Sequence, residues 1–207
     1  MRTLLPALMT LILALAPVPT ADAAHVIPDP PELSEDEEAK LAAGKLVVHK
    51  GIDDVPWKVL GVIEIAATPE TVWAQILDMD TRVLDNKSAE SCEVYGDTTE
   101  GGIRNLYVTM YLQVVGRPIV YHNHYRVDAA GSYMWFTLDP DKESDLVRCD
   151  GSYHVIPSPQ DDAGSRLIYV LDTEPRTNLP DSLRVLMATK GLKQMLTSVK
   201  KRAEDAS

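Results

Sequence analysis

Alternation of apolar and polar residues predicts β-strands through the middle of this chain. Every second residue from 106 to 112 is apolar: Leu106, Val108, Met110 and Leu112. One face of this strand is therefore wholly apolar. Segments with strand-like composition, bounded by Gly, Pro, Asp or Ser, cover 55–66, 92–95, 103–115, 118–128, 132–138, 150–157 and 166–174. The short turns between most of them favour one antiparallel sheet of seven strands.

Helical spacing flanks these strands. Thr68 and Pro69 supply an N-cap and a first helical position, so a helix is expected from there to about Met79, with a brief helical turn over 81–85. Between 180 and about 203, apolar residues recur on one stripe: Val185, Ala188, Leu192, Met195, Leu196 and Val199. This stripe predicts the longest helix of the protein, at the C-terminal end of the domain.

The N-terminal residues have the pattern of a secretory signal peptide. Arg2 precedes an apolar run that is shorter than the roughly 20 residues of a membrane span, and the small residue Ala23 precedes the expected cleavage point. We divide the chain into a signal peptide (1–23), a lead-in with a short acidic helix (24–54) and one domain (55–204). The exported protein is expected in the periplasm or outside the cell.

The composition is acidic, with a formal net charge of −11 at pH 7. This charge repels phosphate backbones and anionic lipid headgroups. Binding to nucleic acid is therefore not expected, and contact with a membrane is expected to be transient at most. Nothing in the pattern bears on the oligomeric state.

The order of the elements resembles the helix-grip fold of the START, polyketide cyclase-like and birch-pollen-allergen-like (SRPBCC) superfamily. Short motifs add to this likeness: Thr68 to Trp73, Trp135, Gly151 to Tyr153, Arg166 to Tyr169, and the prolines Pro175 and Pro180. The sequence departs at Tyr153, where a tryptophan is expected. The resemblance covers roughly 55–203. It implies an α+β fold in which a curved antiparallel sheet wraps around the long C-terminal helix, often with a cavity for a small molecule.

The resemblance also implies which residues line that cavity. The apolar face of the strand over 103–115 is assigned to the interior, with a neighbouring strand and the long helix completing it. The lining comprises Leu106, Val108, Met110, Leu112, Met134, Phe136, Ala188, Gly191, Leu192 and Met195. A solid core without a ligand would show the same alternation, because alternation indicates which residues are buried and not whether a cavity lies between them.

Candidate polar contacts with a ligand are Arg104, His122, His124 and Arg126. Either arginine would pair with an acidic head group, although both residues also suit a surface ion pair. The two histidines share a strand face, and His154 lies on a strand that could be nearby. No carboxylate at ligand spacing supports a metal site there, so no metal is expected.

Cys92 and Cys149 are the two cysteines of the chain. After export a close pair would form a disulfide, but the sequence gives no separation between them. Two apolar thiols in the core are the alternative. Neither cysteine has a second Cys or His at the spacing of a metal site.

Recognisable catalytic motifs are absent from the sequence. There is no nucleophile elbow, phosphate-binding Gly-rich loop, zinc motif or dinucleotide fingerprint, so neither a cofactor nor enzyme chemistry is indicated. The resemblance implies an exported protein that binds or carries a hydrophobic small molecule such as a lipid, sterol, quinone or polyketide-like compound. One alternative is a polyketide cyclase or dehydratase. Another is a protein-interaction module with a filled core that uses Tyr107 and Tyr111.

Overall fold

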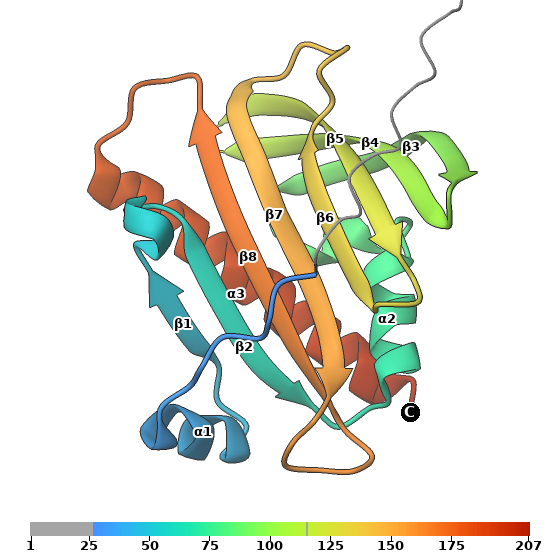
Figure 1. Cartoon of the computed structure of the whole chain (residues 1–207). Helices are drawn as coiled ribbons and strands as arrows, with labels where there is room; N and C mark the ends of the chain where they lie inside the picture. The colour runs from blue at the N-terminus through green and yellow to red at the C-terminus, as the bar shows by residue number, and fades with distance from the viewer. Residues whose placement is uncertain (1–26, 115) are drawn as a thin grey trace, which may run out of the picture.

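The computed structural model describes residues 27–114 and 116–207, and the signal peptide expected over 1–23 lies outside this part. Within it, eight strands form one curved antiparallel sheet (Figure 1). They are β1 (Val47–Lys50), β2 (Val59–Ile65), β3 (Ala89–Glu100), β4 (Ile103–Val114), β5 (Arg117–Asp128), β6 (Tyr133–Leu138), β7 (Leu146–Pro157) and β8 (Ser165–Pro175). The sheet order is β1-β2-β8-β7-β6-β5-β4-β3. Strands β3 to β8 are therefore consecutive neighbours, and β8 returns to pair with β2.

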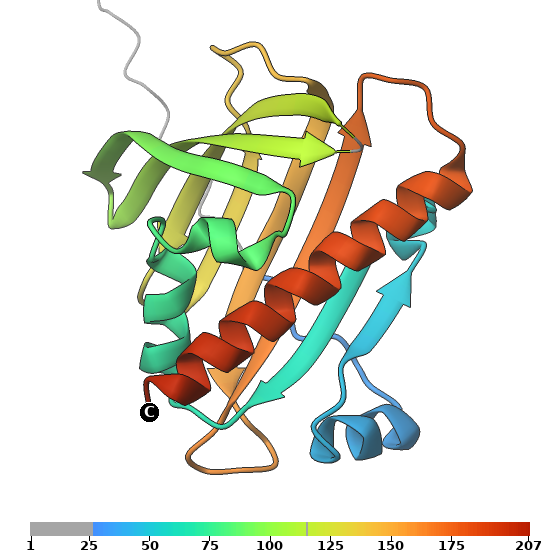
Figure 2. The ribbon, with the colours of Figure 1, turned by 180° about the vertical axis from the view of Figure 1, so that it is seen from behind.

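Two of the described α-helices cover the concave side of this sheet, and a third packs on its convex side through Leu41. The described chain contains α1 (Glu35–Ala42), α2 (Pro69–Leu77), α3 (Asp181–Asp205) and the short 3-10 helices η1 (Ile52–Asp54) and η2 (Arg82–Asp85). Figure 2 shows α3 crossing the concave side diagonally, with α2 beside its C-terminal part. None of the described helices is long and apolar enough to cross a bilayer. This arrangement confirms the predicted α+β helix-grip architecture.

Local sequence explains where the first two α-helices begin. Ser34 and Glu37 form a capping box, in which the backbone N–H of Ser34 donates to the Glu37 carboxylate at 3.0 Å. The Thr68 hydroxyl accepts from the backbone N–H of Thr71 at 3.3 Å, and Pro69 occupies the first turn of α2. The start of α2 matches the predicted position, and α1 is the short acidic helix expected within 24–54.

The sheet has eight strands, so the predicted number of seven was wrong by one. The added strand, β1, pairs antiparallel with β2, with Val47 opposite Val62. The sheet therefore begins before residue 55, where the sequence placed the start of the domain. The sequence of residues 45–49 already indicates a short strand there, which the count of seven did not include. Strand β3 is also longer than the predicted segment 92–95. Its additional residues include charged ones, which are common on an edge strand but do not give an alternating apolar pattern.

Close approach of α3 to β2 organises the centre of the core. Leu192, Leu196 and Val199 of α3 are completely buried there. A Cβ atom at Gly61 of β2 would lie 2.5 Å from a methyl group of Leu196. The missing side chain at Gly61 therefore lets the helix lie close against the sheet.

We expect Gly191→Ala to raise the free energy of unfolding by about 1 kcal/mol. Gly191 lies inside α3, and a Cβ atom there would meet no atom within 4 Å. Alanine reduces the freedom of the unfolded chain and introduces no clash. The control is Gly151→Ala, whose Cβ would lie 2.3 Å from the carbonyl oxygen of Val170 and should destabilise the protein. Urea unfolding measures both, and a loss of stability in Gly191→Ala would contradict this packing.

Candidate functional site

Nine of the ten residues predicted to line a cavity converge between the sheet and α3, and the tenth, Gly191, borders open space beside the helix. Strand β4 contributes four, β6 two and α3 four. Eight of the ten are buried members of one core cluster, Leu112 packs against that cluster, and Gly191 is half-buried. The structure thus brings these nine residues together. That these side chains contact a ligand stays a prediction.

A guanidinium group lies inside this apolar enclosure. Arg82 of η2 is only 5% exposed. Its Nη2 donates to the hydroxyl of Tyr153 at 2.6 Å, and its Nη1 donates to the carbonyl oxygen of Ile76 at 3.4 Å. The guanidinium carbon also lies 5.7 Å from the ring centroid of Tyr125 and 5.1 Å from that of Tyr153. A permanent positive charge therefore lies among aromatic side chains of the concave face.

Four tyrosines from three strands contribute phenols to the same region: Tyr121 and Tyr125 on β5, Tyr153 on β7 and Tyr169 on β8. The rings of Tyr153 and Tyr169 stack with centroids 4.4 Å apart. Burial raises the pKa of each phenol above its ordinary value. The hydroxyls therefore stay protonated at neutral pH, and they serve as hydrogen-bonding groups rather than as bases.

One end of the Asn123 side-chain amide is left without a partner. Asn123 is 1% exposed and lies between two of these tyrosines on β5. Its Nδ2 donates to the Tyr125 hydroxyl at 3.1 Å and lies 3.7 Å from Sγ of Cys149. Its Oδ1 is buried and meets no hydrogen-bond partner among the described residues. Turning the amide over would only exchange which end is unpaired. A water molecule or a polar atom of a ligand would satisfy this group.

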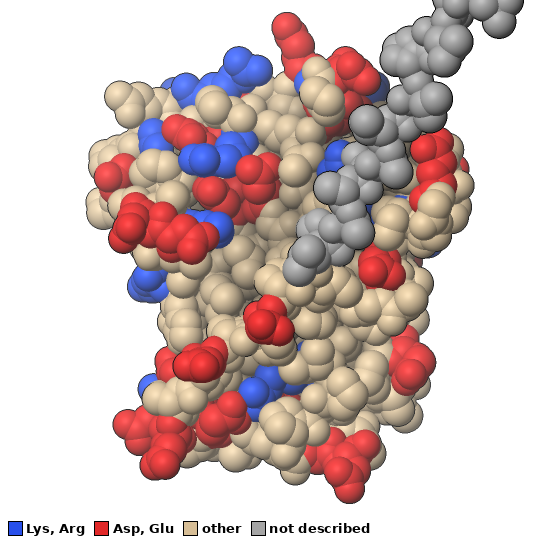
Figure 3. Space-filling view, viewed as in Figure 1, with Lys and Arg blue, Asp and Glu red and all other residues tan. Residues whose placement is uncertain are grey.

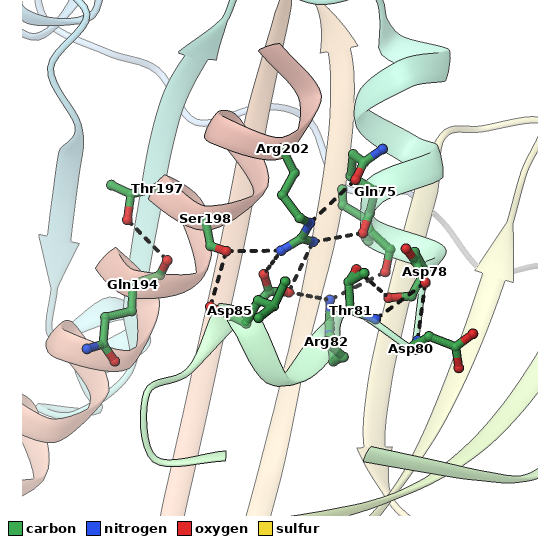
Figure 4. A network of polar contacts seen from close by, with 12 residues as sticks. Gln75, Asp78, Asp80, Thr81, Arg82, Asp85, Gln194, Thr197, Ser198 and Arg202 are labelled. Atoms are coloured by element: carbon green, nitrogen blue, oxygen red, sulfur yellow. Dashed lines mark hydrogen bonds and ion pairs between the residues drawn. The ribbon is translucent and has the colours of Figure 1, made fainter. Parts of the chain in front are cut away.

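Asp85 links this interior to α3 (Figure 4). Its carboxylate lies 3.6 Å from Nη1 of Arg82 and forms a second ion pair with Arg202 of α3. Arg202 also donates to the carbonyl oxygen of Gln75 and to Oγ of Ser198, each at 3.0 Å. Two guanidinium groups therefore share one carboxylate. These three side chains together carry one excess positive charge, which favours an electron-rich or anionic oxygen beside Arg82.

Sequence reasoning missed Arg82 and Asp85. On β5 it selected His122, His124 and Arg126, although the inward-facing polar residues belong to the same stretch. The stretch 81–85 was predicted only as a helical turn. A signal for β5 was present in the register of the hairpin, because Tyr121 stands opposite Met110 and Tyr125 opposite Leu106. Both partners were already assigned to the interior.

The two candidate histidines lie on the opposite face of β5. The His122 ring is 2.9 Å from the hydroxyl of Thr109, and the His124 ring stacks on Tyr107 with centroids 4.2 Å apart. Adjacent residues of a strand point to opposite faces, so neither ring shares the interior with Tyr125. Burial lowers the pKa of both histidines, which keeps them neutral at neutral pH.

The two candidate arginines also form contacts outside the interior. Arg104 is paired with Asp97 at 2.8 Å, and its side chain is 42% exposed. Arg126 donates to the hydroxyl of Thr137 at 3.5 Å on the outer face. The buried Arg82 is therefore the arginine that a molecule in the interior would meet.

The two cysteines are free, so the disulfide considered from the sequence does not form in this structure. Three strands separate Cys92 on β3 from Cys149 on β7 along the sheet. With strands about 4.8 Å apart, that separation exceeds the span of a disulfide. The alternative of two separate thiols packed against the core describes both residues.

Iodoacetamide is expected to label Cys92 in the folded protein well before Cys149. Cys149 is buried, and burial raises the pKa of its thiol to about 12, so the reactive thiolate is scarce. Cys92 is only half-buried. Mass spectrometry of labelled peptides should show both thiols modified in denaturant. No label before reduction, in either state, would show a disulfide instead.

Two hollows open on the convex face of the sheet, away from the cavity-lining residues. One has a volume of about 360 Å³ and lies beside Val147 and Arg148. The other, of about 350 Å³, lies between Pro28, Ile52 and the outer surface of β7. Figure 3 shows acidic and basic side chains interspersed around this face, with largely uncharged surface between them. The hollows share Asp150, but neither includes the buried arginine or the tyrosines.

The fold and this site define a class: a helix-grip protein whose concave interior is apolar except for a buried guanidinium, phenols and one amide. No protein-family profile and no curated protein sequence matches the chain. Solved structures do share its fold. A START superfamily protein from Mycobacterium smegmatis superposes with a TM-score of 0.61 at 17% identity, covering 72% of this chain and 99% of that one.

Two further structures extend the comparison. A STAR-related lipid transfer protein from Xanthomonas axonopodis gives a TM-score of 0.59 at 14% identity, covering 77% of this chain and 92% of the other. The Zhui aromatase/cyclase from a Streptomyces species gives 0.56 at 16% identity, covering 77% and 93%. The chain therefore has the START/polyketide cyclase-like fold. At these identities the likeness concerns the fold and not the activity.

Proposed function

We propose that the protein binds a hydrophobic small molecule between the concave face of its sheet and α3, and carries it in that interior. The observation that supports this most directly is that the Arg82 guanidinium and the unpaired amide of Asn123 both lie against Tyr125. A core that only has to be solid gains nothing from a buried charge and an unpaired polar atom. A ligand whose polar head carries an oxygen acceptor and a hydroxyl would satisfy both groups.

Binding would draw on two kinds of interaction. Apolar burial contributes about 25 cal/mol for each Å² that leaves water, and the polar contacts fix the orientation of the head. The side chains of the interior pack against one another. Uptake therefore requires α3, or the segment that joins η2 to β3, to move away from the sheet.

Fluorescence titration with N-phenylnaphthylamine tests the proposal. This uncharged apolar probe brightens when it leaves water, and we expect saturable binding at one site per chain. Oleate, whose carboxylate suits Arg82, should displace it. Absence of saturable probe binding, together with no lipid retained by the protein after incubation with a lipid extract, would contradict the proposal and favour a filled core.

A cyclase or dehydratase is the second candidate, favoured by the hydrogen bond between Arg82 and Tyr153. A phenol held by a guanidinium can orient and polarise a carbonyl oxygen by donating a hydrogen bond to it. The raised pKa of Tyr153, caused by burial, argues against its use as a base. Recovery of the bound molecule unchanged after incubation would support the carrier, and recovery of a cyclised or dehydrated product would support the enzyme.

We also propose that the protein works outside the cytoplasm, on the sequence of residues 1–23. N-terminal sequencing of the protein from cell fractions tests this, with Ala24 expected as the first residue of the exported form. An intact Met1 in the cytosolic fraction alone would contradict it.

A further inference from the structure

The outward face of α3 carries three large apolar side chains near its N-terminal end. Leu183, Leu186 and Met187 are exposed by 40%, 62% and 38%. Their spacing of three and four residues places them side by side on the helix surface. The opposite face of the same turns packs into the core through Ala188 and Leu192. The first half of α3 is therefore apolar on both faces, and only one face is covered.

Lysines continue this outward face. Lys190, Lys193 and Lys201 follow Leu183 and Leu186 on the same side at helical spacing, and all three are exposed. Within the part of the chain that the structure describes, their ammonium groups form no ion pair with a carboxylate. The protein has a net charge of −11, so this unpaired basic stripe beside exposed leucines is opposite in sign to the overall charge.

The combination matches the interface of an anionic phospholipid bilayer. Leucine and methionine side chains enter the boundary between headgroups and acyl chains, while lysines meet the phosphates. Each lysine near such a surface contributes about 1 kcal/mol. Acidic groups farther away than a screening length of about 10 Å oppose this only weakly at moderate salt. We propose that the N-terminal half of α3, from Leu183 to Lys193, docks on membranes that contain anionic phospholipid.

A second copy of the chain fits this surface less well. Two copies related by a two-fold axis would bring the same patch together. Lys190 and Lys193 would then face lysines of the other copy, and like charges in contact disfavour association. The negative charge that the stripe requires comes from lipid phosphates.

The docking face borders open space beside the helix. Met187, Gly191 and Ser198 follow one ridge of α3, and Oγ of Ser198 donates to the carbonyl oxygen of Leu84 in η2 at 3.2 Å. This ridge therefore faces η2. Along it, a Cβ atom at Gly191 would meet no atom within 4 Å. Leu84 itself is 62% exposed next to the ridge. A docked α3 would thus present the gap between the helix and η2 to the bilayer.

Docking as proposed does not depend on the carrier function, because it uses the face of α3 turned away from the interior. Vesicle sedimentation of the protein without added ligand tests it. We expect binding to vesicles of phosphatidylcholine with phosphatidylglycerol and at least about tenfold weaker binding to phosphatidylcholine alone. Equal binding to both, or binding to neither, would overturn the proposal.

Variants locate the surface. Leu186→Ser with Met187→Ser, and separately Lys190→Glu with Lys193→Glu, should each lower the partition coefficient on the anionic vesicles about tenfold or more. All four positions are exposed, so the fold should be kept, and circular dichroism checks this.

Matched controls lie elsewhere on the surface. Val147→Ser alters an apolar side chain that is 58% exposed on β7, and Lys40→Glu with Lys45→Glu makes the same change of charge near α1. Both controls should bind like the unmodified protein. Equal losses in the α3 variants and the controls, or no loss in the α3 variants, would overturn the assignment. If the unmodified protein bound the vesicles but did not bind N-phenylnaphthylamine, the result would contradict the carrier function and leave the docking proposal standing.

Discussion

Replacing Asp85 with alanine is expected to lower the free energy of unfolding by about 3–5 kcal/mol. The Asp85 carboxylate is shared by Arg82 and Arg202, whose side chains are 5% and 14% exposed. Removing it leaves two guanidinium groups close together without an anion and largely shielded from water. Neither arginine can lose its charge by deprotonation. The repulsion between the two guanidinium groups therefore adds to the cost of keeping them away from water. Urea unfolding followed by circular dichroism measures the loss.

The matched control is Asp97→Ala. Asp97 also pairs with an arginine, Arg104, but both side chains are more than 40% exposed. Pairs of this kind contribute about 0–1 kcal/mol. If Asp85→Ala cost no more than Asp97→Ala, the buried cluster would not have the structural role that we assign to it.

Replacing Arg82 with methionine is expected to weaken binding of oleate by about tenfold to a hundredfold. A hydrogen bond to a charged group contributes about 1.5–3 kcal/mol, and each 1.4 kcal/mol corresponds to a factor of ten. Methionine keeps an unbranched chain in the enclosure and removes the charge. Asp85 retains its ion pair with Arg202, so the variant should fold. Displacement of N-phenylnaphthylamine by oleate measures the affinity.

Two comparisons make this result specific. Arg126→Met removes a guanidinium from the outer face and should leave the affinity for oleate unchanged. Oleyl alcohol, which has the same chain without the carboxylate charge, should lose much less affinity than oleate in Arg82→Met. An equal loss for the acid and the alcohol would mean that Arg82 shapes the enclosure and does not bind an anionic head.

Most of the architecture follows from patterns along the sequence. Alternation over 106–112 identified the interior face of β4, and the stripe from Ala188 to Val199 identified the covered face of α3, because these periods report which side chains are buried. The order of elements then indicated the fold. Strand β1 was not included in the count of seven, because the strand-like pattern over 45–49 does not show that this segment pairs with β2.

The polar part of the site could not be predicted in the same way. A single arginine in a short turn is ordinarily a surface residue. Its burial depends on contact with Tyr153, 71 residues further along the chain, which no local pattern encodes. On β5, five polar residues follow one another from 121 to 125, and only the register with β4 separates the inward Tyr121 and Tyr125 from the outward His122 and His124.

The most direct test of the central proposal is native mass spectrometry of the protein purified from its own host, followed by organic extraction of whatever it holds. We expect one apolar molecule per chain, with an acidic or hydroxylated head. A mass that matches the polypeptide alone, unchanged after exposure to a lipid extract of the host, would contradict the proposal.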